Sequence, residues 1–375
     1  MVLVALNLRM AITSVPPILA DLGLSPAAES LLATLPVALF GVAAAAAIPL
    51  RRRLGEEHGL FAALALLLVG MLVRAAWPAA ALFPGTVLAC AGIAVVNVLL
   101  PSFVGRRFPD RVGMMTGLYT MALIAGASLA AGLTVPAREA AGGSNGVALG
   151  VWAIPLVLAL LVWLPQLRAA GGRATGGGDG GASLWRSPLA WQVTLFMGLQ
   201  SLTYFGPLSW LPTIYREQGL SAASAGALLS IFNALGIVSS LAAPVVAGRM
   251  RDQRPAVAVT VALTALGVVG LLLAPAAGAV LWTVLLGLAQ GAALSLALLM
   301  IVLRAGDDAT AARLSSMAQG GGYLVAATGP LGMGLLHTLS GGLTVPLLAL
   351  LAVVALELVA GLAAGRSRIV APTRG

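Results

Sequence analysis

A single arginine interrupts the apolar stretch that opens the chain. In "MVLVALNLRMAITSVPPIL", Arg9 stands among apolar side chains with Asn7, Thr13 and Ser14 as the only other polar ones. A charge in the hydrocarbon core of a membrane is costly, so it usually faces a bundle interior or reaches the interface. A guanidinium stays ionised and offers planar donors that suit a small delocalised anion. The chemistry favours an anion-binding Arg9 in a central cavity. The alternative is a structural Arg9 that reaches the interface or braces backbone carbonyls.

The composition places these side chains in a membrane. Of the 375 residues, 60% are hydrophobic and 9% are charged, with a mean hydropathy of +1.02; a soluble domain carries about a quarter charged residues. Apolar runs of 18 residues or more recur, which predicts an all-α, polytopic membrane protein. Breaks at Pro, Gly and charged residues predict twelve transmembrane helices. They are expected at 2–20, 27–50, 58–76, 80–104, 111–135, 147–166, 187–212, 222–248, 255–275, 278–303, 309–337 and 342–364.

The basic residues give this topology an orientation. All 21 are arginines, and with both termini in the cytoplasm 17 fall on the inner side, 3 (Arg74, Arg138 and Arg216) on the outer side, and Arg9 remains. The positive-inside rule therefore predicts an inner-membrane protein with cytoplasmic termini and an even number of spans.

Several function classes are disfavoured by the residue types. The net charge of +9 is spread over short loops rather than one soluble face, so nucleic-acid binding is not expected. A phosphate-binding loop of the Gly-x₄-Gly-Lys type is impossible without lysine. No metal-ligand cluster, cofactor motif or catalytic grouping is recognisable, so we expect neither an enzyme nor a cofactor. Cys90, the single cysteine, reads as a small packing residue.

The chain reads as two related halves. The Gly-rich segment "AAGGRATGGGDGGAS" (169–183) is typical of a flexible linker. It predicts an N-terminal six-helix bundle at 1–168, a cytoplasmic linker at 169–186 and a C-terminal six-helix bundle at 187–375. "GLSPAAESLLATLPVALFG" from Gly23 aligns with "GLSAASAGALLSIFNALGI" from Gly219, which indicates a parallel repeat. In this alignment Gln200 is the counterpart of Arg9. Two repeated halves around a midplane site are typical of a secondary transporter.

Four segments carry a resemblance to a known family, and together they cover about a third of the chain. The segments are "NLRMAITSV" (7–15), "GIAVVNVLLPSFVGRRFPDRVGMMTGLYTMAL" (92–123), "LQSLTYFGPLSWLPTIYREQGLSAASAGALLS" (199–230) and "GLAQGAALSLALLMIVLRAGDDATAARLSSMAQGGGYLVAATGPLGMGLLH" (287–337). The sequence resembles the major facilitator superfamily. Within it, the sequence is similar to the cyanate-porter group of cyanate permeases and nitroimidazole transporters.

The resemblance implies a monomeric transporter with a central cavity lined by helices 1, 4, 7 and 10, with helices 2, 5, 8 and 11 moving around it. The substrate-binding residues it implies are Arg9, Asn7, Thr13, Asn97, Tyr119, Gln200, Tyr204, Trp210, Asn233, Gln290, Gln319 and Tyr323. Each of the polar ones has a structural alternative, because membrane Ser, Thr, Asn and Gln often bond backbone carbonyls or neighbouring helices.

The family's loop motif after helix 2 is only partly kept. "PLRRRLGEE" (49–57) retains Arg53 and Gly55 but has no Asp at the usual place, whereas the second copy "GRMRDQR" (248–254) retains Gly248, Arg249 and Asp252. These five residues are the expected gating residues. The middle of helices 2 and 8 carries no Arg, unlike the nitrate-porter branch, so nitrate is disfavoured. The first span is also short for a membrane.

Acidic residues are nearly absent from the predicted spans. Eleven of the twelve Asp and Glu residues fall in loops or at helix ends, and Glu357 alone lies inside a span. Because Glu357 precedes Arg366 by about two turns, the favoured interpretation is that it reaches the inner interface.

The sequence thus predicts a secondary transporter that moves a small anion or weakly acidic organic solute, cyanate-like by resemblance, by alternating access. One alternative is an exporter of hydrophobic compounds such as nitroimidazoles or drugs. An alternative from another class is a non-transporting membrane sensor or scaffold.

Overall fold

The computed structural model describes residues 1–22, 24, 26–78, 80–169 and 184–370, and this part of the chain is helical without strands. The chain forms two compact units. Unit 1 comprises Met1–Phe103 and Ala122–Gly181, and unit 2 comprises Val104–Met121 and Ala182–Gly375. The predicted linker at 169–186 lies mostly outside the described residues. The boundaries predicted for the two halves stay a prediction.

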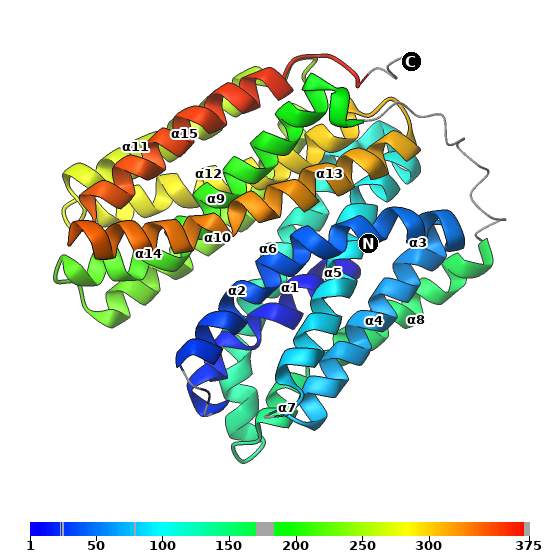
Figure 1. Cartoon of the computed structure of the whole chain (residues 1–375), viewed down its shortest axis with the longest axis horizontal. Coiled ribbons are helices and arrows are strands. Elements are labelled where there is room, and N and C mark those ends of the chain that lie inside the picture. Colours follow the sequence, from blue (N-terminus) through cyan, green and yellow to red (C-terminus); the bar gives the residue numbers. More distant parts are fainter. Residues whose placement is uncertain (23, 25, 79, 170–183, 371–375) are drawn as a thin grey trace. The chain divides into compact units, whose positions relative to one another are not determined.

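The helices are coloured in chain order in Figure 1. The first part of the chain holds α1 (Val2–Thr13), η1 (Pro16–Leu22), α2 (Pro26–Ala43), η2 (Ala44–Ala46), α3 (Ala47–Leu54), α4 (Glu56–Ala76), α5 (Leu82–Arg107), η3 (Pro109–Arg111), α6 (Val112–Ala140), α7 (Asn145–Gly150) and α8 (Ala153–Ala169). The later part holds η4 (Leu184–Arg186), α9 (Pro188–Glu217), α10 (Ala222–Ala247), α11 (Arg254–Leu273), α12 (Ala279–Arg304), α13 (Asp308–Ala326), α14 (Thr328–Ser340) and α15 (Thr344–Ala364).

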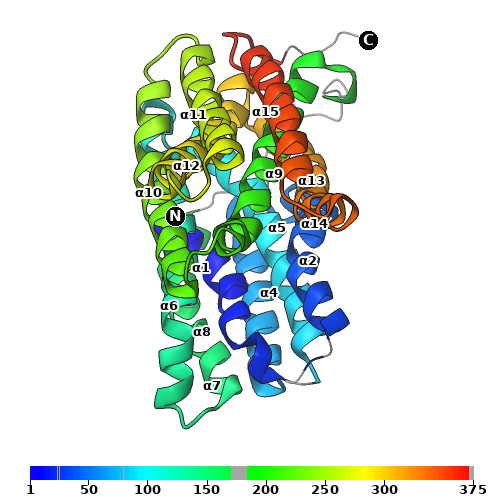
Figure 2. The ribbon, with the colours of Figure 1, turned by 90° about the vertical axis from the view of Figure 1, so that its left-hand side faces the viewer.

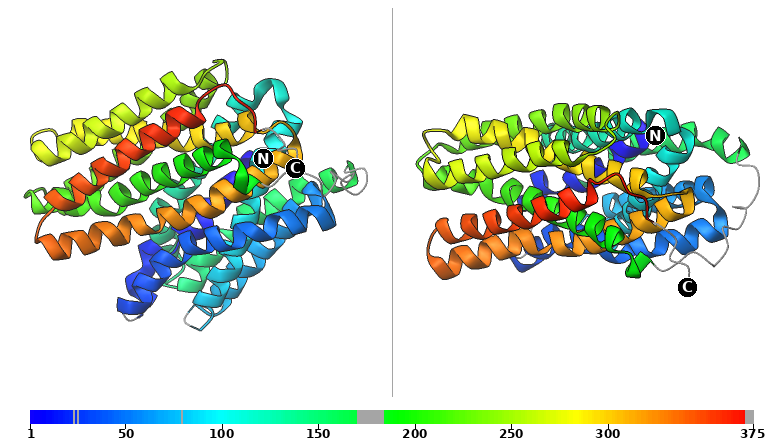
Figure 3. Two further views of the ribbon diagram at one scale, coloured as in Figure 1. Left: turned by 45° about the horizontal axis from the view of Figure 1, so that its top comes forward. Right: turned by 90° about the horizontal axis from the view of Figure 1, so that it is seen from above.

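Four of the twelve predicted spans are broken rather than continuous. Each break lies near a proline, which removes a donor and clashes with the carbonyl four residues earlier. Pro49 lies four residues after Ala45 in the second span, and Pro155 lies four residues after Val151 in the sixth. The first span ends as α-helix at Thr13, before Pro16 and Pro17, and the eleventh breaks after Ala326, four residues before Pro330. Figures 1 and 3 show α14 continuing the line of α13 beyond this break.

Nine helical segments of the described chain are long and apolar enough to cross a membrane. The predicted spans outside this group are the first, seventh and eleventh. The first is shortened to Val2–Ile18. The seventh and eleventh correspond to α9 and α13, which are long enough but carry more polar side chains. These three spans hold most of the predicted substrate-binding residues.

Large apolar side chains lie exposed on the outer helix faces. Val359 is 68% exposed, Ile154 is 67% exposed and Val259 is 62% exposed, all within long helices. Exposure on this scale would be unfavourable in water. It is what lipid-facing helices require, since lipid solvates such side chains.

Glycines allow close helix contacts that position the candidate site residues. A Cβ on Gly126 of α6 would lie 2.1 Å from the Leu6 carbonyl oxygen of α1, in unit 1. In unit 2, a Cβ on Gly198 of α9 would lie 3.1 Å from the Cα of Gly322 on α13. Small residues let backbones approach in this way. These contacts hold α1 at Leu6, the residue before Asn7, and hold α9 at Gly198, two residues before Gln200.

Candidate functional site

Arg9 lies where α1 meets α2 in unit 1. It is half-buried, and its guanidinium carbon is 6.0 Å from the centroid of the Phe40 ring, which is itself 1% exposed. An aromatic face at this distance attracts a cation. The contact stabilises the charge of Arg9 within unit 1.

The other candidates in unit 1 are Asn7, Thr13 and Asn97, and the first two donate hydrogen bonds to backbone carbonyls. The Asn7 amide nitrogen donates to the Leu3 carbonyl at 2.7 Å, which orients the amide. Its oxygen Oδ1 is buried and has no hydrogen-bond partner among the described residues. The Thr13 hydroxyl donates to the Arg9 carbonyl at 2.7 Å. This is the backbone hydrogen bond expected if Thr13 has a structural role instead of binding substrate. Asn97 is buried on α5.

Two buried tyrosines come together in unit 2. Tyr119 on α6 is 2% exposed, Tyr323 on α13 is 3% exposed, and the two lie within range of electrostatic interaction. The Tyr119 hydroxyl has no hydrogen-bond partner in the described part of the chain. Buried polar groups are nearly always bonded, so this phenol is a candidate ligand contact.

Gln200, the repeat counterpart of Arg9, is fully buried on α9. Its amide nitrogen donates to the Met197 carbonyl at 3.0 Å and to the Ser201 hydroxyl at 2.7 Å. These bonds fix the amide so that Oε1 is the remaining acceptor, and within the described chain Oε1 has no donor.

The remaining candidates of unit 2 have clear packing roles. Tyr204 stacks on Phe232 of α10 at a centroid distance of 6.1 Å, next to Asn233, whose amide donates to the Leu229 carbonyl at 2.9 Å. The Trp210 indole nitrogen donates to the Pro330 carbonyl at 3.4 Å, linking α9 to α14.

Two glutamines of unit 2 face neighbouring side chains. The Gln319 amide donates to the Ser315 hydroxyl at 2.9 Å. The Gln290 amide donates to the Thr264 hydroxyl of α11 at 3.5 Å, and its Oε1 is buried without a partner among the described residues.

Four predicted substrate-binding residues therefore carry what we call open polar atoms: Asn7 Oδ1, Tyr119 Oη, Gln200 Oε1 and Gln290 Oε1. Three are amide oxygens, which accept hydrogen bonds, and one is a phenol, which donates or accepts. Such atoms bind a solute that brings N–H or O–H donors, or ordered water.

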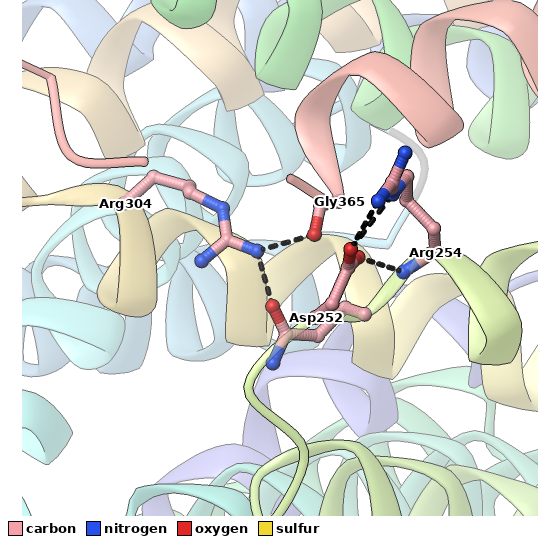
Figure 4. Close-up of polar contacts among 5 residues, drawn as sticks. Asp252, Arg254, Arg304 and Gly365 are labelled. Carbon is pink, nitrogen blue, oxygen red and sulfur yellow. Dashed lines mark hydrogen bonds and ion pairs between the residues drawn. The ribbon is translucent and has the colours of Figure 1, made fainter. Parts of the chain in front are cut away.

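Among the predicted gating residues of the second loop, Asp252 lies in a polar cluster of unit 2 (Figure 4). Asp252 accepts from the Arg254 backbone at 2.9 Å and pairs with the Arg254 guanidinium at 2.6 Å. Arg304, at the end of α12, donates to the Ala364 carbonyl at 2.8 Å, to the Gly365 carbonyl at 2.9 Å and to Gln253. Gln253 in turn donates to the Met250 carbonyl at 2.7 Å. The cluster ties the loop after α10 to the ends of α12 and α15.

The side-chain hydrogen bond from Arg254, together with its backbone hydrogen bond, holds the pKa of Asp252 below its ordinary value. Gly248 also has a packing role, because a Cβ there would lie 3.0 Å from the Cα of Gly113 on α6. Arg249 is exposed.

The first loop is built around a glycine. Gly55 adopts a φ of +80° between α3 and α4, a conformation that favours glycine, and Arg53 is exposed. Glu56 accepts a hydrogen bond from Ser102 at 2.6 Å in the same unit.

The sequence interpretation does not foresee the burial of three charged residues. Glu357, expected to reach the inner interface, is fully buried and accepts from the Thr203 hydroxyl at 2.8 Å. Arg74, assigned to the outer side, is 1% exposed and donates to the Ser14 hydroxyl at 3.2 Å. Arg304, assigned to a loop, is 4% exposed in the cluster above. Glu357 was detectable, because it falls on the spacing of the buried residues Leu350, Val354 and Gly361.

Comparison with known proteins identifies the family. The sequence profile described as Major Facilitator Superfamily matches residues 1–330. The chain belongs to the major facilitator superfamily. It is therefore a multi-pass membrane protein of a transporter family, and the fold predicted from the sequence is confirmed.

Two relatives from Escherichia coli refine this placement. The chain is 39% identical to a protein named 2-nitroimidazole transporter over 98% of this chain and 94% of the relative. It is 31% identical to the cyanate transport protein CynX over 91% of this chain and 90% of the relative. The predicted resemblance to the cyanate-porter group is confirmed.

A solved structure agrees on the fold. The proton:xylose symporter XylE superposes with a TM-score of 0.78 at 14% identity, covering 98% of this chain and 96% of that one. At this identity the likeness concerns the fold alone.

Proposed function

We propose that this transporter moves a small anion or weakly acidic organic solute across the inner membrane by alternating access. The observation that carries the proposal is the set of open polar atoms at predicted substrate-binding residues, together with the half-buried Arg9 on Phe40. A weak acid suits both features. Its ionised form pairs with a guanidinium, and its neutral form brings an N–H or O–H to amide oxygens.

Arg9 carries the charge recognition in this proposal. Asn7 lies two residues earlier on α1, in the same unit, and supplies a hydrogen-bond acceptor. The relatives' names agree with this chemistry, since cyanate is a small anion and a nitroimidazole is a compact heterocycle with a weakly acidic N–H.

Uptake into proteoliposomes tests the role of Arg9, with labelled cyanate and 2-nitroimidazole as probes. Arg9→Gln removes hydrogen bonds to a charged partner worth roughly 1.5–3 kcal/mol, so uptake at low probe concentration falls at least about tenfold. Arg366→Gln changes an exposed arginine near the C-terminus and leaves uptake unchanged. Equal uptake by Arg9→Gln and wild type contradicts the proposal.

A second candidate function is export of nitroimidazole-like compounds. The 39% identity to the 2-nitroimidazole transporter, against 31% to the cyanate transport protein, favours a nitroimidazole-like solute, and export is the direction proposed for it. Everted vesicles distinguish the two directions, because an exporter loads them with 2-nitroimidazole and ignores cyanate.

The orientation is part of the proposal. The arginine distribution supports cytoplasmic termini. A cysteine placed at Arg251, in the loop after α10, then reacts with an impermeant maleimide only in everted vesicles.

A further inference from the structure

Glu357 is the feature of the molecule that the proposed function leaves unused. It lies on the buried side of α15, whose opposite side exposes Leu356 and Val359. It is the fourteenth of the 21 residues of α15, and its hydrogen-bond partner Thr203 is the sixteenth of the 30 residues of α9. The carboxyl group thus lies at the middle of a long helix, deep within the apolar part of the bundle.

The helices around Glu357 bring no charge to it. α15 packs on α9, α11 and α14, and Figure 2 shows α9 and α15 side by side. The titratable and charged groups of these helices, with the arginine at the end of α12, are Tyr204, Tyr215, Arg216, Glu217, Arg254, His337 and Arg304.

Each of these groups is engaged elsewhere. Tyr204 stacks on Phe232, and the Tyr215 hydroxyl donates to the Ala279 carbonyl at 2.9 Å. Glu217 pairs with His337 at 3.2 Å, at the end of α9. Arg254 pairs with Asp252, and Arg304 reaches Ala364, seven residues beyond Glu357 along α15. Arg216 is exposed beside Glu217, at the end of α9.

Glu357 is therefore a carboxyl group with an incomplete set of partners. Oε2 accepts from Thr203, and Oε1 is buried without a partner among the described residues. A carboxylate buried away from a cation is strongly disfavoured, whereas the protonated carboxyl carries no charge. The surroundings are also tightly packed, since a Cβ on Gly361 would lie 2.6 Å from Val257 Cγ1 and 2.8 Å from Phe196 Cδ2.

Thr203 connects this carboxyl group to the predicted substrate-binding helix. Its hydroxyl has a single hydrogen and two acceptors in reach: Glu357 Oε2 at 2.8 Å and the Gln200 carbonyl oxygen at 3.1 Å. When Glu357 is ionised, the hydrogen goes to the carboxylate. When Glu357 is protonated, the carboxyl O–H donates to Thr203, and the Thr203 hydroxyl turns to the Gln200 carbonyl.

We propose that Glu357 is a proton-binding site on α15 that couples proton uptake, through Thr203, to the α9 segment holding Gln200 and Tyr204. One proton adds to the carboxylate and leaves from the same oxygen, so the site cycles without another reactant. The coupling to solute rests on the proposed function. The proton site itself does not.

Infrared spectroscopy of the purified protein tests the proton site without any solute. At about pH 6, where a carboxyl group in water is ionised, wild type shows the carbonyl stretch of a buried protonated carboxyl, and this band falls as the pH is raised to about 9. Glu357→Gln loses this band, and Glu217→Gln, a partly exposed glutamate on α9, keeps it. A band that survives Glu357→Gln, or no such band in wild type, overturns the proposal.

Proteoliposomes test the coupling, with cyanate and 2-nitroimidazole as probes. Glu357→Gln keeps solute counterflow, which needs no net proton movement, but loses accumulation driven by a pH gradient by about tenfold. Glu357→Asp restores part of this accumulation, which excludes misfolding as the cause. Gradient-driven accumulation by Glu357→Gln equal to that of wild type overturns the coupling. If neither probe moves in wild type, the proposed function fails, while the infrared result still decides the proton site.

Discussion

The open polar atoms distinguish two kinds of buried tyrosine in unit 2. The Tyr119 hydroxyl has no partner in the described part of the chain, whereas the Tyr215 hydroxyl contacts both the Ala279 carbonyl and Thr283 Oγ1, the latter at 2.7 Å. Removing a bonded hydroxyl leaves its partners unsatisfied, whereas removing an unbonded one relieves a desolvated group. The same Tyr→Phe change therefore separates a ligand contact from a structural contact.

Tyr119→Phe is expected to leave the free energy of unfolding within about 0.5 kcal/mol of wild type or to raise it slightly, while weakening binding of a probe solute about five- to tenfold. Tyr215→Phe is expected to lower the free energy of unfolding by about 1–3 kcal/mol. Unfolding in detergent and a binding titration measure both. A marked destabilisation by Tyr119→Phe would show that its hydroxyl is structural.

The residues of the site were only partly predictable from the sequence. Polar residues in apolar spans pointed to Asn7, Tyr119 and Gln200, because burial of a polar group needs a reason. The same pattern does not reveal that Thr13 and Asn233 bond backbone carbonyls four residues earlier. Glu357 is assigned to the interface because Arg366 follows it by about two turns, although its spacing from Leu350, Val354 and Gly361 already places it on their face of α15.

At the scale of the elements, glycines decide how closely the helices approach. Gly126 and Gly132 both lie within α6, yet a Cβ at Gly126 would lie 2.1 Å from the Leu6 carbonyl oxygen while a Cβ at Gly132 meets nothing within 4 Å. The contact at Gly126 holds the segment of α1 that carries Asn7 and Arg9.

Gly126→Ala is expected to lower the free energy of unfolding by about 1–3 kcal/mol through overpacking and to weaken solute binding by displacing α1. Gly132→Ala is the matched control, expected to raise stability by up to about 1 kcal/mol through helix propensity. Chemical denaturation of both variants measures the difference. Equal stability of the two variants would contradict the close α1–α6 contact.

The start of α13 depends on an ionised cap. Asp307 accepts from the Thr310 backbone and the Thr310 hydroxyl, both at 2.8 Å. Burial opposes its ionisation, but these hydrogen bonds, a further one from the Ala309 backbone and the charge of Arg313 hold the pKa of Asp307 below its ordinary value. Because the pKa is lower in the folded state, this contribution to stability is present above the ordinary Asp pKa and is lost as the pH falls through the lowered value.

Asp307→Ala is therefore expected to lower the free energy of unfolding by about 1 kcal/mol at neutral pH, the usual value of an N-cap. Asp307→Asn keeps the cap but does not titrate. Its free energy of unfolding is expected to be close to that of wild type at neutral pH and higher than that of wild type below about pH 4. Unfolding measured across this pH range checks both. An unchanged difference between wild type and Asp307→Asn at low pH would exclude the ionised cap.

The breaks in the helices show the limits of helix propensity as a guide. The break after Ala326 has a visible cause in Pro330, as the end of α1 has in Pro16. The second span, however, passes through the 3₁₀ turn Ala44–Ala46, three alanines that favour an α-helix by propensity. The local signal for this turn is Pro49, which lies four residues after Ala45 and disfavours an α-helical hydrogen bond there.

At the scale of the whole molecule, binding and stability are linked. A solute that binds only the folded protein raises the free energy of unfolding, by about 2.7 kcal/mol at a concentration of 100 times its Kd, and so raises the melting temperature. For a chain of this size we expect a rise of a few degrees, roughly 2–5 °C. Because linkage reports the bound solute regardless of transport direction, it tests substrate class and the role of Arg9 together.

The decisive measurement is the melting temperature of purified wild type and Arg9→Gln with cyanate, small carboxylates, 2-nitroimidazole and a lipophilic cation. The account predicts that a small anion or weak acid stabilises wild type and that Arg9→Gln loses this stabilisation while melting normally without solute. Stabilisation by the lipophilic cation alone, equal in wild type and Arg9→Gln, would contradict it and make Arg9 a structural residue.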